Sequence, residues 1–160
     1  MAEIIKVKTC DGQVFDVLKA RAETSTTLNN LILDAPAGGD VPLPEVNGDI
    51  FQFVMKWVEM HKDDPVTVVP PAENGPAAPA LTEADKEFFA AIDQQSLFQL
   101  ILAANYLDIR KLLDMCCRTV ADSVLGKTPK QIYAQFGVAK ELTPEEEAEI
   151  RRDNPWLDDN

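Results

Sequence analysis

The sequence predicts an α/β protein in which a small N-terminal sheet precedes a longer series of helices. Two short apolar runs flank Asp11-Gly12, a dipeptide that tolerates the positive φ angles of a tight hairpin turn. Further along, apolar residues recur every three or four positions, as on one face of a helix. Residues 94–125 contain neither Gly nor Pro. At 160 residues the chain is long enough for one domain with a buried core and a short appendage.

The first part of the chain supplies the predicted sheet and one short helix. Residues 4–9 and 14–18 form the two strands of the hairpin, and Ser25 or Thr24 caps a short helix that ends before Pro36. Residues 41–44 contain two prolines, so this segment is extended and can be an edge strand at most.

Asn47 is the predicted N-cap of a stronger helix that ends near His61. We expect His61, the only histidine, to lie at a solvated helix end, because it has no second His and no Cys at the spacing of metal ligands. The next stretch, residues 63–80, has five prolines in eighteen residues and is predicted to be a flexible loop.

Three further helices follow this loop in the prediction. Thr82 caps a helix to Ala91, Asp93 caps the central helix, and Asp108 caps the long helix after a break at Tyr106-Leu107. The central helix is apolar around most of its circumference, which is typical of a helix buried on all sides.

The long helix carries an unusually wide apolar stripe of about 180°. Cys116 and Cys117 fall on this stripe, where we expect them to behave as small buried hydrophobic residues. One edge of the stripe can cover the core, so the other edge is left as a predicted protein-binding face.

Two short helices are predicted at the C-terminus. Each begins with a capping Thr, a Pro and a polar residue at the third position, at Thr128-Pro129 and at Thr143-Pro144. Their few large apolar residues contribute roughly 1.5 to 3 kcal/mol each when buried, against about 1 to 2 kcal/mol of backbone ordering for every residue. These helices must therefore gain stability from the long helix, from a partner, or from both.

The charge and composition exclude several classes of function. The net charge is −12, from 27 acidic and 15 basic residues, which argues against nucleic acid and anionic membranes as partners. No glycine-rich phosphate loop is present, and no base lies near a candidate Ser or Cys nucleophile in the sequence, so we expect no enzyme, no cofactor and no metal. The N-terminus lacks a signal-peptide pattern, which predicts a cytoplasmic and nuclear protein.

Six segments resemble the S-phase kinase-associated protein family, the adaptors of SCF-type cullin ubiquitin ligases. They extend over nearly the whole chain in the family's order: CDGQVFDV at Cys10, VPLPEVN at Val41, HKDDP at His61, LFQLILAANYLDIRKLLDMCCRTVA at Leu97, GKTPKQI at Gly126 and EEEAEIRRDNPWL at Glu145. The resemblance implies a POZ (BTB-like) α/β fold over residues 1–125, with F-box-binding helices over residues 126–160.

The resemblance also implies two partner surfaces. A cullin scaffold would contact Asn105 and Tyr106. F-box proteins would contact one set of residues on the long helix and another in the C-terminal segment: Leu113, Cys117, Val120, Val124, Ile132, Phe136, Val138 and Trp156.

Other interpretations remain open at this point. Leu113 and Val120 could belong to the core, and Pro155 could redirect the chain before Trp156. The protein could be a POZ module that self-associates or serves another complex, or a thiol enzyme acting through Cys116 and Cys117. The resemblance leaves open whether the free protein forms a weak homodimer.

Overall fold

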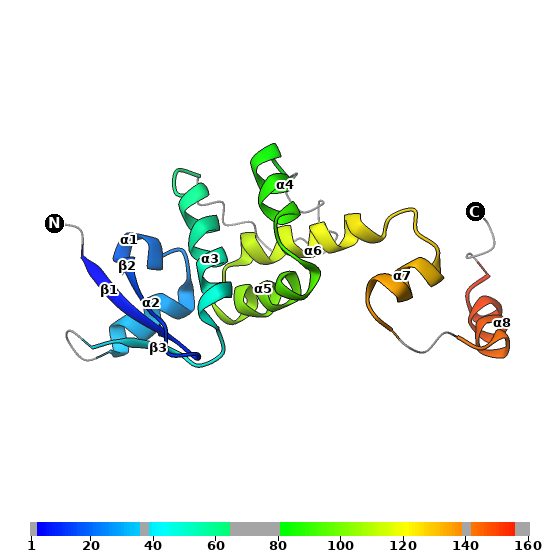
Figure 1. Ribbon diagram of the computed structural model, residues 1–160, viewed down its shortest axis with the longest axis horizontal. Coiled ribbons are helices and arrows are strands. Elements are labelled where there is room, and N and C mark those ends of the chain that lie inside the picture. The colour runs from blue at the N-terminus through cyan, green and yellow to red at the C-terminus, as the bar shows by residue number, and fades with distance from the viewer. Residues whose placement is uncertain (1–2, 36–38, 65–80, 139–141, 156–160) are drawn as a thin grey trace. The chain divides into compact units, whose positions relative to one another are not determined.

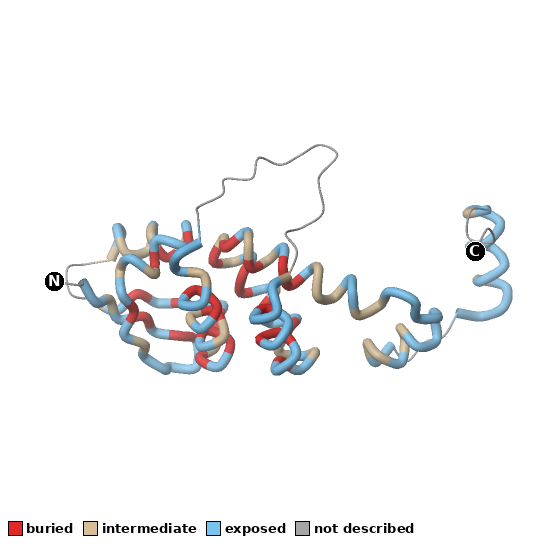
Figure 2. Tube along the Cα trace, turned by 90° about the horizontal axis from the view of Figure 1, so that it is seen from above, coloured by how far each residue is buried: buried red, intermediate tan, exposed pale blue. Residues whose placement is uncertain are grey.

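The computed structural model describes residues 3–35, 39–64, 81–138 and 142–155, and the chain forms two compact units (Figure 1). The first unit is Met1–Val120 and the second is Ala121–Asn160. Every buried residue that is described belongs to the first unit (Figure 2).

The first unit opens with the predicted hairpin. Strand β1 (Ile4–Thr9) pairs antiparallel with β2 (Val14–Leu18), and Gly12 in the turn has a φ of 82°. Strand β3 (Val41–Leu43) pairs in parallel with β1, which gives the order β2-β1-β3. The proline-containing strand is thus an edge strand, as predicted.

Three helices follow or interrupt the sheet: α1 (Lys19–Ala22), α2 (Thr26–Asp34) and α3 (Gly48–Met60). The Ser25 side chain accepts a hydrogen bond from the amide of Leu28, and that of Asn47 accepts one from Ile50, so both predicted caps are confirmed. The short helix α1 lies in a stretch to which the sequence assigned no element.

Five more helices complete the described chain: α4 (Glu83–Ala90), α5 (Gln94–Tyr106), α6 (Arg110–Val124), α7 (Pro129–Gln135) and α8 (Pro144–Asp153). The side chains of Thr82, Asp93, Thr128 and Thr143 cap α4, α5, α7 and α8 as predicted. The predicted cap at Asp108 is wrong. Helix α6 begins at Arg110, so Ile109 holds the position before it, and the Asp108 carboxylate instead accepts from the Arg110 Nε at 3.2 Å.

The core of the first unit joins the inner face of the sheet to α3, α5 and α6. Phe51 and Trp57 of α3, Leu100 of α5 and Leu112 of α6 are at most 1% exposed, and α3 packs against α5. At roughly 1.5 to 3 kcal/mol for each fully buried large apolar side chain, these contacts hold the helices that carry the candidate site.

Helix α5 is not buried on all sides, so that prediction is wrong. Leu97 and Leu100 face the core, but Leu102 is 68% exposed and Phe98 is 39% exposed. One side of the helix meets α3 while the other faces solvent, although both sides are apolar.

The prediction for the adjacent cysteines of α6 is half right. Cys116 is buried but Cys117 is exposed, so only the first cysteine behaves as predicted.

The prediction that His61 is a solvated helix end is also wrong. Its ring stacks on Trp57 with the ring centroids 4.2 Å apart, and its Nε2 lies 3.1 Å from the Asp85 Oδ1. Asp85 is completely buried, and its second oxygen accepts hydrogen bonds from the backbone and the hydroxyl of Thr82. His61 therefore connects the end of α3 to the start of α4.

The predicted flexible loop at residues 63–80 lies outside the described residues from position 65 onward. Within the described part of the chain, we find no helix whose length and apolar character would let it cross a membrane. Among the same residues, no three or more His, Cys, Asp or Glu side chains gather closely enough to hold a metal ion.

Candidate protein-binding surfaces

The hinge between α5 and α6 positions the two residues that the resemblance assigns to a cullin contact. The Leu107 amide donates to the Ala103 carbonyl at 2.8 Å, and the Ile109 amide donates to the Ala104 carbonyl at 3.0 Å. Between them, Asp108 adopts a left-handed φ of 53°, which turns the chain sharply. This turn leaves Asn105 exposed and Tyr106 half-buried against the core.

Helix α2 fixes this hinge from the other side. The Thr27 hydroxyl donates to the Tyr106 carbonyl at 2.7 Å, and the buried Ser25 hydroxyl donates to the Leu107 carbonyl. The last carbonyls of a helix lack partners within the helix, so these two hydroxyls satisfy acceptors at the end of α5. The backbone beneath Asn105 and Tyr106 is therefore held in place by contacts from residues distant in sequence.

The exposed side of α5 continues from this hinge. Phe98, Leu102 and Asn105 are spaced at i, i+4 and i+7, which places them along one face of the helix. We call Phe98, Leu102, Asn105 and Tyr106 the α5 surface. It combines two partly or largely exposed apolar side chains with a polar end, which is the composition of a protein interface.

Phe98 and Leu102 were missed by the sequence reasoning. The signal was present, because a helix with apolar residues all round must either be buried on every side or expose some of them. The sequence alone did not show that one side of α5 is left uncovered by the described elements of the fold.

The F-box candidates on α6 occupy one face of that helix. Leu113, Cys117, Val120 and Val124 are spaced at i, i+4, i+7 and i+11. Leu113 and Val120 are half-buried and pack on the core of the first unit, Val124 is half-buried, and Cys117 is exposed. The alternative that Leu113 and Val120 serve the core is thus partly right, because each has one side in the core and remains partly exposed.

The remaining F-box candidates belong to the second unit. Ile132 and Phe136, one turn apart at α7, are half-buried, while Val138 is 47% exposed. Trp156 lies outside the described residues. No described residue of this unit is buried, so its apolar side chains retain area that a partner can cover.

Cys116 is unsuited to thiol chemistry. Burial, with a smaller contribution from the neighbouring Cys117, raises the pKa of its thiol to about 12. Because the thiolate is the nucleophile, a buried thiol with this pKa is almost entirely protonated near neutral pH. The burial and the raised pKa of the Cys116 thiol argue against an enzyme that acts through this residue.

Comparisons with known proteins agree with the predicted fold. The domain described as Skp1 family, tetramerisation domain, matches residues 3–63, and the domain described as Skp1 family, dimerisation domain, matches residues 110–157. The first of these is the family's POZ domain, so the predicted α/β POZ fold is confirmed.

Three relatives match nearly the full length of the chain. SKP1-like protein 20 of Oryza sativa subsp. japonica is 40% identical over 163 residues, which cover 96% of this chain and 93% of the relative. The E3 ubiquitin ligase complex SCF subunit sconC of Talaromyces stipitatus is 39% identical over 99% of both chains. SKP1-like protein 1A of Arabidopsis thaliana is 39% identical over 97% of both chains. The domain matches and this identity over almost the whole length show that the chain belongs to the Skp1 family, as its motifs predict.

Proposed function

We propose that this protein is the non-catalytic adaptor subunit of an SCF-type E3 ubiquitin ligase, which bridges a cullin scaffold and F-box substrate receptors. The observation that carries the proposal is that α5 and α6, joined by one fixed hinge, present two separate sets of partly exposed apolar residues. Two sets suit a bridging protein, whereas a protein with one partner needs one. The sconC relative is itself named as a subunit of an SCF ubiquitin ligase complex.

The cullin is proposed to bind the α5 surface. Leu102 supplies the largest exposed apolar area, and Phe98 adds a partly exposed ring one turn earlier. Asn105 and the hydroxyl of Tyr106 supply polar contacts at the end of the same surface. An interface with an apolar centre and a polar margin gains affinity from the first and orientation from the second.

F-box proteins are proposed to bind the α6 face together with the second unit, so that residues 1–125 form the POZ part and residues 126–160 the receptor-binding part. Helices α7 and α8 have capped N-termini but no buried residue, so packing within the unit contributes little to offset the ordering of the chain. An F-box that covers Cys117, Val124, Ile132, Phe136 and Val138 would supply the missing buried area.

This function requires no active site. An adaptor acts by holding a substrate receptor near the rest of the ligase, which raises the effective concentration of the substrate. The three unpaired cysteines suit a reducing compartment. We therefore also propose a cytoplasmic and nuclear location, which fluorescence microscopy of the tagged chain would test.

The scaffold surface is tested by replacing Asn105 and Tyr106 with Lys in the full chain. A bound cullin would have to bury both lysine ammonium groups, which costs desolvation energy, so we expect cullin binding to be lost while F-box binding persists. The control is Glu87→Lys on α4, which changes the net charge by the same two units at an exposed position outside the α5 surface. Cullin capture by the double variant at the level of the control would refute the assignment.

The receptor surface is tested by Cys117→Arg, a change at an exposed position of α6 that the helix tolerates. We expect F-box binding to weaken by at least tenfold, because the charge would enter an apolar interface, while cullin binding serves as the internal control. A chain ending at Leu125 should lose F-box binding and keep cullin binding. Undiminished F-box affinity in both variants would exclude this face.

A further inference from the structure

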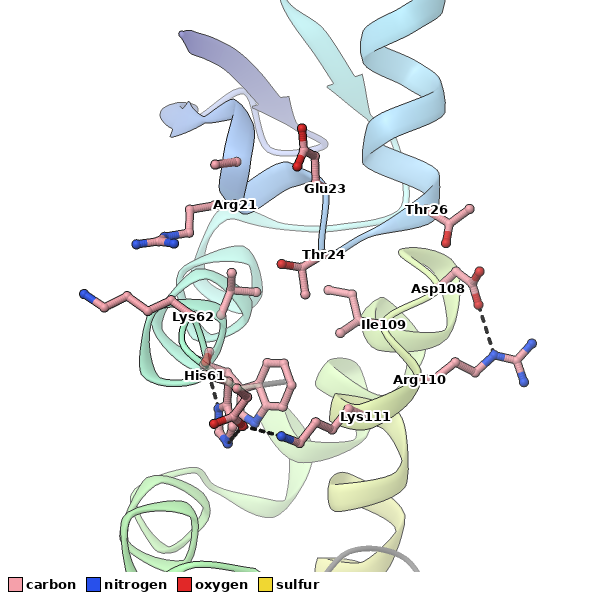
Figure 3. Close-up of a pocket in the computed structure, with 14 residues that line it drawn as sticks. Arg21, Glu23, Thr24, Thr26, His61, Lys62, Asp108, Ile109, Arg110 and Lys111 are labelled. Atoms are coloured by element: carbon pink, nitrogen blue, oxygen red, sulfur yellow. Dashed lines mark hydrogen bonds and ion pairs between the residues drawn. The ribbon is translucent and has the colours of Figure 1, made fainter. Parts of the chain in front are cut away.

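A cavity in the first unit is lined by none of the residues assigned to either partner. It has a volume of about 670 Å³ and opens between the connector from α1 to α2, the end of α3 and the start of α6 (Figure 3). Pockets for small ligands in proteins span roughly 300 to 1,000 Å³. Its lining includes the apolar side chains of Trp57, Val58 and Ile109, and the hydroxyls of Thr24 and Thr26. The cavity is thus large enough for a small molecule and has both apolar and polar walls.

One wall of this cavity contains a hydrogen-bond donor without an acceptor. Trp57 is 1% exposed, and its buried Nε1 has no hydrogen-bond partner among the residues that the structure describes. The indole Nε1 carries a hydrogen and can only donate. Because buried donors are nearly always paired in folded proteins, a bound molecule with an acceptor oxygen would complete the site.

The start of α6 adds a second preference for an acceptor. Ile109, Arg110 and Lys111 line the cavity, and they include the first residues of a 15-residue helix. The residue before the helix is Ile109, whose hydrocarbon side chain cannot accept a hydrogen bond, and the first turn contains no acidic residue. The N-terminal end of a helix carries a partial positive charge and attracts anions.

The charged side chains of the lining are nearly balanced in a chain of net charge −12. The lining contains four cations and three acids: Arg21, Lys62, Arg110 and Lys111, and Glu23, Asp64 and Asp108. Glu59 lies outside the lining but pairs with Arg21 at 2.8 Å and with Lys62 at 2.9 Å, so it already neutralises part of the charge of these two cations. Arg110 and Lys111 remain as candidates for contact with an anion.

The cations of the lining differ in direction. Lys111 reaches inward toward His61 and pairs with Asp64, whereas Arg110 turns away toward Asp108 (Figure 3). An ammonium group has three hydrogens, so Lys111 can keep Asp64 and still donate to a ligand. Lys111 is therefore the cation best placed to contact a molecule in the cavity.

We propose that this cavity binds a small oxyanion, a carboxylate or a phosphate monoester, carried on a compact apolar group. The oxyanion accepts hydrogen bonds from the Trp57 Nε1 and from Lys111, while the apolar group lies against Val58 and Ile109. This binding site is independent of the cullin and F-box surfaces, so its failure would leave the proposed adaptor function untouched.

The test follows the indole N–H signal of Trp57 by ¹H–¹⁵N NMR in the full chain with Trp156→Phe, which leaves one tryptophan. The probes are phenyl phosphate, benzoate, inorganic phosphate and the neutral benzyl alcohol. We expect a saturable shift with phenyl phosphate or benzoate, and about tenfold weaker binding of benzyl alcohol, which lacks the anion. A weaker shift with inorganic phosphate would identify the contribution of the apolar group. Equal binding of benzyl alcohol, or no saturable shift with any probe, would overturn the proposal.

Two variants assign the contacts. Lys111→Met keeps an unbranched, flexible side chain of similar size and removes its charge, and we expect it to weaken binding about fivefold to tenfold. Lys86→Met is the matched control, because Lys86 is also paired with an acid, Glu83, but does not line the cavity. Trp57→Phe keeps an aromatic ring without the N–H and should weaken binding similarly if the variant folds. Equal affinity of the Lys111 and Lys86 variants would refute the site even if Trp57→Phe does not fold.

Discussion

The two units of this protein have equally strong local helix signals but very different burial. Helix α4 in the first unit and helices α7 and α8 in the second all begin with a complete capping box. Yet α4 contributes Phe88 and Phe89 to a core, whereas α7 and α8 contain no buried residue (Figure 2). Capping therefore determines where a helix begins, and packing determines how much stability it adds.

The largest expected effect separates the units by a core substitution. Leu100 is completely buried, so Leu100→Ala should lower the free energy of unfolding by about 2 to 5 kcal/mol. Ile132→Ala in α7 should lower it by less than about 1 kcal/mol in the free protein, because Ile132 is half-buried. Urea unfolding of both variants measures the difference. Equal losses would show that the second unit has a cooperative core of its own.

A smaller effect compares two capping threonines. Thr82→Ala should cost about 1 kcal/mol of global stability, because the hydroxyl caps α4 and donates to the buried Asp85 at 2.7 Å. Thr143→Ala removes the same kind of cap from α8 and should speed amide exchange there without moving the unfolding midpoint of the first unit. A shared shift of that midpoint would mean that the units unfold together.

The pH dependence of the first unit should reveal one long-range anchor. Hydrogen bonds from the Thr9 hydroxyl, then from the Gly48 amide and the Gln13 side chain, lower the pKa of Asp11 from 3.8 to about 2. The folded pKa lies below the unfolded one, so this stabilisation is complete above about pH 4 and is lost as the pH falls toward 2. Asp11→Asn should flatten that part of the stability profile. An unchanged profile between pH 4 and 2 would show that Asp11 does not anchor the hairpin to α3.

The smallest expected effect concerns the adjacent cysteines. An alkylating reagent should modify the exposed Cys117 in the folded protein and leave Cys116 unmodified, because burial raises the pKa of the Cys116 thiol to about 12. Mass spectrometry after digestion measures each site. Bound F-box protein should slow the modification of Cys117, while rapid modification of Cys116 would show that α6 opens readily from the core.

Much of the fold could be predicted from the sequence because its signals are local. The hairpin turn at Gly12 and the caps at Asn47, Thr82 and Thr143 each depend on a few neighbouring residues, and the structure confirms them. The errors are tertiary. His61 pairs with Asp85 across a long intervening segment, and no local pattern reports such a contact.

The candidate site shows the same division. Spacing alone placed Leu113, Cys117 and Val120 on one face of a helix, but the burial of each depends on which elements the fold brings against α6. The choice of Asn105 and Tyr106 came from family resemblance. The structure adds Phe98 and Leu102 to the same surface, because both are partly or largely exposed. The sequence pattern marked them only as apolar and could not tell whether they are exposed or buried.

The contacts from Ser25 and Thr27 to the hinge carbonyls have a kinetic consequence. They preorganise the α5 surface, so association there needs no ordering step and should proceed at the rate set by diffusion and orientation. Association at the second unit must also order helices that have no buried residue among those described, which costs free energy. In a ligase with this adaptor, the scaffold surface would thus associate faster than the receptor surface.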